Sequence, residues 1–312
     1  MQTYVSIARE VKSKIIQSIK NNKAQGILFS GGLDTGIIVA IFPKLPCINI
    51  QLENFSTDLT YAQELGKIFD LKIYFLTINA QEVIDAIPEV IRILKSFDPA
   101  LPNDLAVYFG LKFAKEKGIN SLLTGDGADE LFAGYDYMRQ TPGLAEYIRY
   151  ISRRMLFSSN KLGEYLGVGI KQPFISKSIV DLAVNELSCD LKIAKYDEKI
   201  FGKWILRKAF EDILSPNIAW QTKRPLEIGS GMTQIRKIIA DKISDNEFAK
   251  KKKEYGIDFY TKDHFYYYEI YKQVIGDIPI PLADQEICPS CGAGFFIGSL
   301  HCYTCGWVKK WE

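Results

Sequence analysis

Four cysteines in the last part of the sequence are spaced like metal ligands. Cys288 and Cys291 form one C-x-x-C pair, ten residues separate it from the pair Cys302 and Cys305, and a glycine directly follows each pair. Four thiolates can close a tetrahedral zinc site, and glycine tolerates the tight turn that such a pair requires. The spacing therefore predicts a zinc ribbon with a structural Zn²⁺ ion, with His301 as a neighbour rather than a ligand. A redox dithiol is the alternative for one pair.

A second group of residues could bind phosphate. The segment GILFSGGLDTGIIVAIF, residues 26–42, is apolar on both sides of Ser30-Gly31-Gly32, which predicts a buried strand, a turn and a helix. Such a turn directs backbone N–H groups and the positive end of the helix dipole at one point, where an anion could bind. Asp34 beside it would repel phosphate unless a divalent cation lay between them. A tight turn with a capping aspartate is the alternative.

A third group is acidic. In LLTGDGADELFAGY, residues 122–135, Asp126, Asp129 and Glu130 follow another predicted strand, at the edge where a parallel sheet presents ligands. If Asp34 and Asp129 project into the same crevice, they could share a Mg²⁺ ion that bridges the phosphates of a nucleotide. The alternative is a glycine turn followed by a helix with acidic residues in its first turn.

The elements that must position these residues alternate between strand and helix. Their alternation predicts an α/β fold with a doubly wound parallel sheet covered on both faces. From 127 to about 275 the signals are mainly helical. Ser56 or Thr57 is the candidate N-cap of the third helix. The expected strands are 26–29, 47–52, 71–78 and 119–125, and the expected helices are 3–20, 34–42, 56–70, 79–95 and 103–117.

Composition sets the frame for these groups. A chain of 312 residues with 47% hydrophobic content can bury a full core in one large domain with a small appendage. We expect a catalytic domain over 1–275, a proline-rich linker over 276–287 and the ribbon over 288–312. Thirty-nine basic against thirty-seven acidic residues favour neither nucleic acid nor anionic membrane as the default partner. No apolar run reaches membrane-spanning length and no secretory signal begins the sequence, so we expect a cytoplasmic protein without membrane association.

Two of these segments resemble one known family. SGGLDT, residues 30–35, closely matches the SGGxDS pyrophosphate loop of the PP-loop ATP pyrophosphatases. TGDGADELFAGY, residues 124–135, is similar to the SGEGxDExFxGY signature of the asparagine synthetase synthase domain, and the resemblance extends over roughly residues 20–275. It implies a PP-loop ATP pyrophosphatase fold and a reaction in which ATP adenylates a carboxylate, aspartate being the leading case. Ammonia then attacks the acyl-adenylate to form an amide, with AMP and pyrophosphate as products.

The resemblance also implies roles for individual residues. Asp34 and Asp129 match magnesium ligands, and Lys223 matches a catalytic lysine that neutralises charge on the α-phosphate. The loop expected to hold the pyrophosphate portion of ATP consists of Ser30, Gly31, Gly32, Asp34 and Thr35, and the positions that frame adenine and ribose are Phe29, Ile50, Thr124 and Gly125.

The sequence departs from the family pattern at several points. Asp126, the second catalytic candidate, replaces a glutamate thought to handle substrate or proton transfer, and Gln221 stands where the family often has arginine. The ATP loop begins at Ser30, which leaves no room before it for the glutaminase domain of glutamine-using members. We therefore expect ammonia as the nitrogen source, supplied freely or by a separate glutaminase subunit. The zinc ribbon is the expected docking site for that subunit or for a carrier protein with a bound substrate.

Two other classes of function are also compatible with the sequence. A PP-loop enzyme that adenylates a tRNA base for sulfur or nitrogen transfer would suit the ribbon, although the signature at 124–135 belongs to the amidating branch. A non-catalytic nucleotide-binding or scaffold protein is the third class, against which Asp34, Asp129 and Lys223 all argue. The lysine run 250–253 lies between Glu247 and Glu254, and this pattern predicts a solvated helix face rather than a nucleic-acid site.

Overall fold

The structure, a computed structural model, describes residues 4–55 and 59–311. The chain forms two compact units, each assembled from distant parts of the sequence. Unit 1 comprises Met1–Ile50, Thr57–Leu76 and Gly110–Pro225. Unit 2 comprises Gln51–Ser56, Thr77–Phe109 and Leu226–Glu312.

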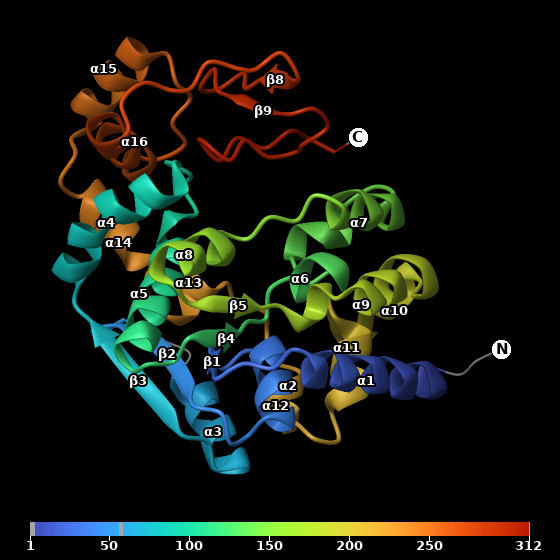
Figure 1. Ribbon diagram of the computed structural model, residues 1–312. Helices are drawn as coiled ribbons and strands as arrows, with labels where there is room; N and C mark the ends of the chain where they lie inside the picture. The colour runs from blue at the N-terminus through green and yellow to red at the C-terminus, as the bar shows by residue number, and fades with distance from the viewer. Residues whose placement is uncertain (1–3, 56–58, 312) are drawn as a thin grey trace. The chain divides into compact units, whose positions relative to one another are not determined.

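A five-stranded sheet forms the centre of unit 1, with the last residues of β2 and β3 counted in unit 2. Its order is β3-β2-β1-β4-β5, and β1 pairs in parallel with both β2 and β4, as β4 does with β5 (Figure 1). Strand order reverses between β1 and β4, and the loops that follow these two strands flank a switch point where open α/β sheets bind ligands. The predicted α/β class is thereby confirmed. The strands are β1 (Gly26–Leu28), β2 (Cys47–Leu52), β3 (Ile73–Ile78), β4 (Ser121–Leu123) and β5 (Gly169–Lys171).

The helices predicted around these strands are present. Helix α1 buries Val11, Ile15 and Ile19, which recur at helical spacing along one face. Thr3 and the two N-cap candidates, Ser56 and Thr57, lie outside the described residues. The helices are α1 (Tyr4–Asn21), α2 (Leu33–Ile41), α3 (Leu59–Phe69), α4 (Ala80–Leu94) and α5 (Leu101–Glu116).

The part of unit 1 after β4 contains more strand than the sequence predicts. β5 and a hairpin of β6 (Ala194–Tyr196) and β7 (Lys199–Phe201) interrupt the helices. These strands have three residues each, and the ends of β5 are exposed. The sequence therefore has no run of alternating apolar residues that would predict them. The helices here are α6 (Ala128–Leu131), η1 (Asp136–Gln140), α7 (Leu144–Ser152), α8 (Ser158–Leu166), η2 (Pro173–Ile175), α9 (Lys177–Asp181), η3 (Leu182–Glu186), α10 (Cys189–Lys192), α11 (Trp204–Phe210) and α12 (Pro216–Ala219).

Unit 2 is built on helices. α4 begins with a capping box between Asn79 and Glu82, and α16 packs against α4 and α14. α15 buries none of its residues, which confirms the solvated face predicted for lysines 250–253. None of the described helices is both long and apolar enough to cross a membrane. The remaining elements are α13 (Leu226–Gly229), α14 (Gln234–Ala240), α15 (Asp245–Tyr255), α16 (Lys262–Val274), β8 (Gln285–Ile287) and β9 (Gly294–Phe296).

Candidate active site and metal centre

The Ser-Gly-Gly turn joins β1 to α2 in unit 1. Gly31 has a φ of +81°, and a Cβ atom there would lie 2.8 Å from the backbone nitrogen of Ala62, so only glycine fits. Gly32 is the N-cap of α2 and provides no side-chain cap, while its N–H donates to Ser30 Oγ at 3.2 Å. Ser30 Oγ also lies 3.1 Å from Thr35 Oγ1. The turn therefore presents an uncapped helix N-terminus lined by hydroxyl groups, a suitable place for a phosphate.

The loop after β4 fits against the first turn of α2 and against η2 because its glycines lack side chains. A Cβ atom on Gly125 would lie 2.9 Å from Cβ of Asp34, and one on Gly127, whose φ is +90°, would lie 2.1 Å from Ile175 Cγ2. This close approach carries Asp129, in the first turn of α6, towards Asp34 in α2. The structure thus brings together the two carboxylates, named here the acidic pair.

A lysine that the motifs did not identify lies between the acidic pair. Lys203 Nζ is 2.5 Å from Asp34 Oδ2 and 2.8 Å from Asp129 Oδ1. Lys223 Nζ lies 3.1 Å from the other oxygen of Asp129 and 5.7 Å from the ring centre of Tyr135. Lys203 begins the segment KWILRKAF, which is part of the resemblance, but it stands in no short motif. Only the folded chain distinguishes it from other lysines.

The charges in this cluster shift one another's ionisation. Burial raises the pKa of Asp34 above its usual range, and the nearby Lys203 only partly offsets that effect. Burial also acts to raise the pKa of Asp129, but Lys203 and Lys223 together hold it below its usual range. Burial would lower the pKa of Lys203, yet the two carboxylates outweigh it and the pKa is raised. Lys203 is therefore a charged ammonium group at neutral pH.

The remaining predicted nucleotide-site residues lie on neighbouring strands of the sheet. Phe29 follows β1, Ile50 lies in β2 and Thr124 follows β4, and all three side chains are buried. Asp126 is held by three donors to its Oδ2 atom. These are Thr124 Oγ1 at 2.8 Å, Ser159 Oγ at 2.7 Å and Gln172 Nε2 at 2.9 Å. Asp126 lies in the loop that leads from β4 to Asp129, and these three hydrogen bonds fix the position of its carboxylate.

One buried arginine supports both lysines of the site. Arg207 Nε donates to the carbonyl of Gly202 at 2.9 Å, directly before Lys203. Its Nη1 donates to the carbonyls of Ala219 at 2.7 Å and Gln221 at 3.0 Å, just before Lys223. Burial lowers the pKa of Arg207 to about 10, which leaves it charged at neutral pH. Sequence reasoning missed this residue because the groups to which it donates these hydrogen bonds are backbone carbonyls.

Gln221 joins the lysine-bearing segment to the phosphate loop. Its Nε2 donates to the carbonyl of Gly31 at 3.3 Å and to that of Ile218 at 3.2 Å. The residue that departs from the family's arginine therefore makes a neutral contact to the backbone of the phosphate loop. Lys223 itself is 23% exposed, so its ammonium group can still reach a ligand.

The residues fit a magnesium ion. Mg²⁺ prefers carboxylate oxygens and is usually held by one or two carboxylates together with substrate phosphates. Asp34 Oδ1 is buried and has no hydrogen-bond partner, so a ligand-accepting oxygen lies inside the site. Asp34 and Asp129 would hold the ion, and the phosphates of a nucleotide on the α2 N-terminus would complete its coordination.

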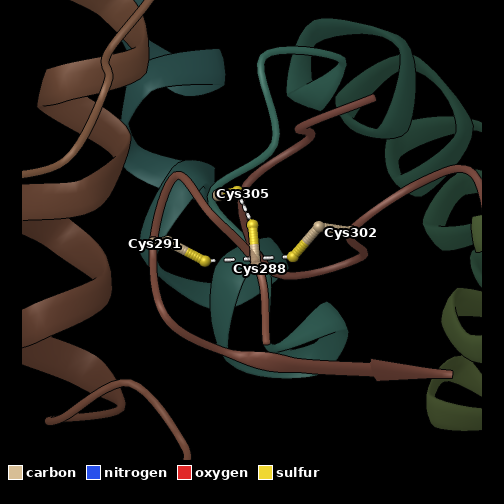
Figure 2. A group of neighbouring side chains, drawn as sticks. All are labelled: Cys288, Cys291, Cys302 and Cys305. Atoms are coloured by element: carbon tan, nitrogen blue, oxygen red, sulfur yellow. Dashed lines mark hydrogen bonds between the residues drawn. The ribbon is translucent and has the colours of Figure 1, made fainter. Parts of the chain in front are cut away.

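The four cysteines of unit 2 converge as the sequence predicts (Figure 2). Their sulfur atoms all lie within 4.8 Å of one another, with Cys288 and Cys305 3.7 Å apart and Cys291 and Cys302 3.8 Å apart. A tetrahedron of sulfurs about 2.3 Å from a zinc ion has edges of about 3.8 Å, so the spacing fits.

The glycines after each cysteine pair form the expected knuckles. Gly292 N donates to the carbonyl of Cys288 at 2.9 Å and Gly306 N to that of Cys302 at 2.8 Å. Both glycines have positive φ, +78° and +77°. Among the described residues, this is the only place where three or more potential metal ligands of the cysteine, histidine and carboxylate types gather.

The ribbon packs closely on the turn between α4 and α5, within unit 2. Phe97 N donates to the carbonyl of Thr304 at 2.8 Å, and His301 Nε2 lies 2.8 Å from Asp98 Oδ2. Phe97 is fully buried and also contacts His264 and two tyrosines of α16. His301 therefore pairs with a carboxylate outside the cysteine group. The proline-rich stretch gives way at Gln285 to β8, which pairs with β9.

The fold and the first site define a class of protein. An open parallel sheet with a Ser-Gly-Gly loop at its switch point and an acidic pair beside it is the PP-loop synthetase arrangement. The family model for asparagine synthase matches residues 15–166 and 144–269, and the chain belongs to this family.

Relatives across distant organisms agree with this assignment. The chain is 26% identical to a probable asparagine synthetase (glutamine-hydrolyzing) of Dictyostelium discoideum, over 94% of this chain and 59% of that protein. It is 27% identical to asparagine synthetase B (glutamine-hydrolyzing) of Escherichia coli strain K12, over 90% of this chain and 56% of that protein. The chain thus spans little more than half the length of these relatives.

Proposed function

We propose that this chain is an ATP-dependent, AMP-forming ligase that adenylates a carboxylate and aminates it with ammonia. The observation that carries the proposal is the acidic pair, with Lys203 and Lys223, beside an uncapped helix N-terminus at the switch point. Aspartate is the leading candidate substrate, because the relatives named above are asparagine synthetases. A separate glutaminase subunit is the proposed source of ammonia where glutamine is the ultimate donor.

In this proposal a substrate carboxylate oxygen attacks the α-phosphorus of ATP, and the bond to the β-phosphate bridging oxygen breaks. The N-terminus of α2 and the hydroxyls of Ser30 and Thr35 bind the departing pyrophosphate. Bound Mg²⁺ would supply neutralisation of phosphate charge. Lys223 stabilises the negative charge that grows on the α-phosphate, as a fixed ammonium group near a reacting phosphate does.

Ammonia nitrogen then attacks the acyl carbon, the amide bond forms, and AMP leaves with the electrons of the acyl–phosphate bond. The attacking nitrogen must lose a proton. Asp126 is the proposed acceptor, because three donors fix its Oδ2 atom and Oδ1 is the remaining oxygen. The same donors fix the aspartate side chain, which is shorter than the glutamate that the family has at this position.

We propose that the four cysteines bind one Zn²⁺ ion that stabilises the ribbon, since thiolate ligands at tetrahedral spacing favour zinc. The ribbon is also the proposed docking site for the glutaminase subunit or for a carrier protein. Ile287 and Phe296 lie on the same face of the β8–β9 hairpin and are 69% and 59% exposed, and the neighbouring Ile297 is 65% exposed. Exposed apolar side chains of this size are typical of a protein-binding surface.

The test is product analysis with the purified chain. We expect AMP and pyrophosphate from ATP in the presence of one carboxylate of a panel that includes aspartate, with ammonium chloride as nitrogen donor. Glutamine in place of ammonium should give no amide unless a glutaminase is added. ADP as the nucleotide product, or glutamine-driven synthesis by the chain alone, would contradict the proposal. Nucleotide turnover stimulated by bulk tRNA and by none of the carboxylates would favour the base-adenylating alternative.

A further inference from the structure

Lys203 occupies the place between the acidic pair. Its side chain is 3% exposed, and its ammonium group contacts both carboxylates at salt-bridge distance. The backbone holds it there: Lys203 has a φ of +54°, in the left-handed region, and its N–H donates to the carbonyl of Phe132 at 2.9 Å. A non-glycine residue in this conformation costs free energy, so the surrounding structure must favour it.

The path of the Lys203 side chain depends on a missing Cβ atom. A Cβ on Gly134 would lie 2.4 Å from Lys203 Cε and 1.9 Å from Asp129 Oδ1. Gly202 is similarly confined, because its Cβ would lie 2.0 Å from the carbonyl oxygen of Ala133. The side chain of Lys203 therefore runs through space that a Cβ atom on Gly134 would occupy, and Gly202 lets the backbone before Lys203 lie against Ala133.

We propose that Lys203 is the resident counter-ion of the magnesium site. Its ammonium group holds Asp34 and Asp129 together while no metal is bound, and it turns to the phosphate oxygens when metal and nucleotide arrive together. The inference rests on the proposed function, which makes the acidic pair the metal ligands. It adds that the metal site is occupied by an internal cation before binding.

The charges of Lys203 and the acidic pair link metal binding to nucleotide binding. Two buried carboxylates repel each other and are costly to bury without a cation, and Lys203 removes much of that cost. A divalent ion that arrives alone must displace an ammonium group from the two carboxylates that form its salt bridges. A nucleotide brings phosphate oxygens that can accept hydrogen bonds from the ammonium group. Metal and nucleotide should therefore strengthen each other's binding, and this coupling must be reciprocal.

The alternative is that Lys203 is a permanent part of the fold whose contacts never change. In that case removal of its charge would leave the acidic pair unpaired and would destabilise the protein. Divalent ions would still have no better access to the carboxylates. The two cases differ in how nucleotide-free metal affinity responds to the loss of the ammonium group, which a binding measurement can detect without any turnover.

The experiment is a titration of the full chain with Mn²⁺, followed by electron paramagnetic resonance, with and without a non-hydrolysable ATP analogue. Wild-type protein should bind Mn²⁺ weakly alone and at least about tenfold more tightly with the analogue, within the usual range of such couplings. Lys203→Met, which keeps an unbranched side chain that is only one atom shorter, should bind Mn²⁺ alone at least about tenfold more tightly than wild type. Mn²⁺ should also raise the melting temperature of this variant more than that of wild type.

Two further variants serve as controls. Lys203→Arg keeps the positive charge and should retain weak nucleotide-free binding. Lys223→Met removes an ammonium group that contacts only Asp129 of the acidic pair and is partly exposed, so its gain in Mn²⁺ affinity should be much smaller. Equal nucleotide-free affinities of wild type and Lys203→Met would overturn the inference.

If Lys203→Met does not fold, the Mn²⁺ titrations of the wild-type protein with and without the analogue still test the inference. Mn²⁺ affinity that is equal with and without the analogue would overturn the counter-ion inference while leaving the metal site intact. Absence of Mn²⁺ binding even with the analogue would instead overturn the proposed magnesium site, and the inference with it.

Discussion

The charged cluster of unit 1 and the cysteine cluster of unit 2 are both candidate metal sites, but they differ in what holds them together without a metal. The acidic pair contacts two ammonium groups, so attraction within the protein balances its charge. The four thiols form no disulfide, and their sulfur atoms lie as close as 3.7 and 3.8 Å to one another. A site with its own counter-ion is formed before its metal arrives, whereas a four-thiolate site requires its metal to be stable.

The largest effect that would sharpen this comparison is expected for Asp129→Asn. This change removes one proposed magnesium ligand and the partner shared by Lys203 and Lys223. We expect the rate of AMP formation to fall by about 1,000-fold or more, because charge neutralisation by a metal ion is worth several kcal/mol in a transition state. Circular dichroism should show a retained fold.

A matched control for that variant is Asp136→Asn. Asp136 forms an exposed pair with Arg139, and exposed pairs contribute little. Near-normal activity of Asp129→Asn would show that the acidic pair does not bind a catalytic metal.

The next effect concerns Lys223→Ala. The proposed interaction with the α-phosphate grows as the transition state forms, so kcat should fall about a hundredfold while the KM for ATP changes little. Steady-state kinetics with ammonium as donor measure the split. Lys161, an exposed lysine of α8, provides the control. Weaker ATP binding at unchanged kcat would assign Lys223 to binding alone.

A smaller effect is expected for Arg207→Lys. The lysine keeps the charge, but its single nitrogen cannot take the places of both Nε and Nη1 of Arg207, so the segments carrying Lys203 and Lys223 should lose their fixed positions. We expect an about tenfold lower kcat, since small displacements of catalytic groups are costly. The exposed Arg154→Lys is the control. Unchanged kcat with a lower melting temperature would mean that Arg207 serves stability only.

The smallest effect on catalysis is expected at the cysteine cluster. Elemental analysis should find one zinc ion per chain in the wild type and none in Cys288→Ser, whose melting temperature should fall by roughly 5 °C or more. Turnover measured well below that temperature should change less than about threefold, because the proposed zinc role is structural. Cys189→Ser, outside the cluster, should retain zinc. Full zinc content in Cys288→Ser would refute the four-cysteine site.

The two sites also differ in how far the sequence could predict them. The cysteine cluster lies within 18 residues and depends on local turns, so the spacing of its cysteines was sufficient to predict that they converge. The loops with Asp34 and Asp129 were predictable because each follows a strand of a parallel sheet. Lys203 and Arg207 were not, since their partners lie far away in the sequence or are backbone carbonyls. Similarly, β5 was missed because a short strand with exposed ends leaves no apolar pattern.

The contact between the ribbon and the α4–α5 turn has a consequence for the order of folding during synthesis. Ser96 and Thr304 are 208 residues apart, and the carbonyl of Thr304 accepts hydrogen bonds from Ser96 Oγ and from the N–H of Phe97. A ribosome that has made α4 and α5 must therefore complete α16 and both cysteine pairs before Phe97 obtains this partner. Unit 1, whose last segment ends at Pro225, can close earlier. With the proposed zinc ion bound to the four cysteines, the zinc supply would act on this last step of folding, when the turn after α4 becomes fixed.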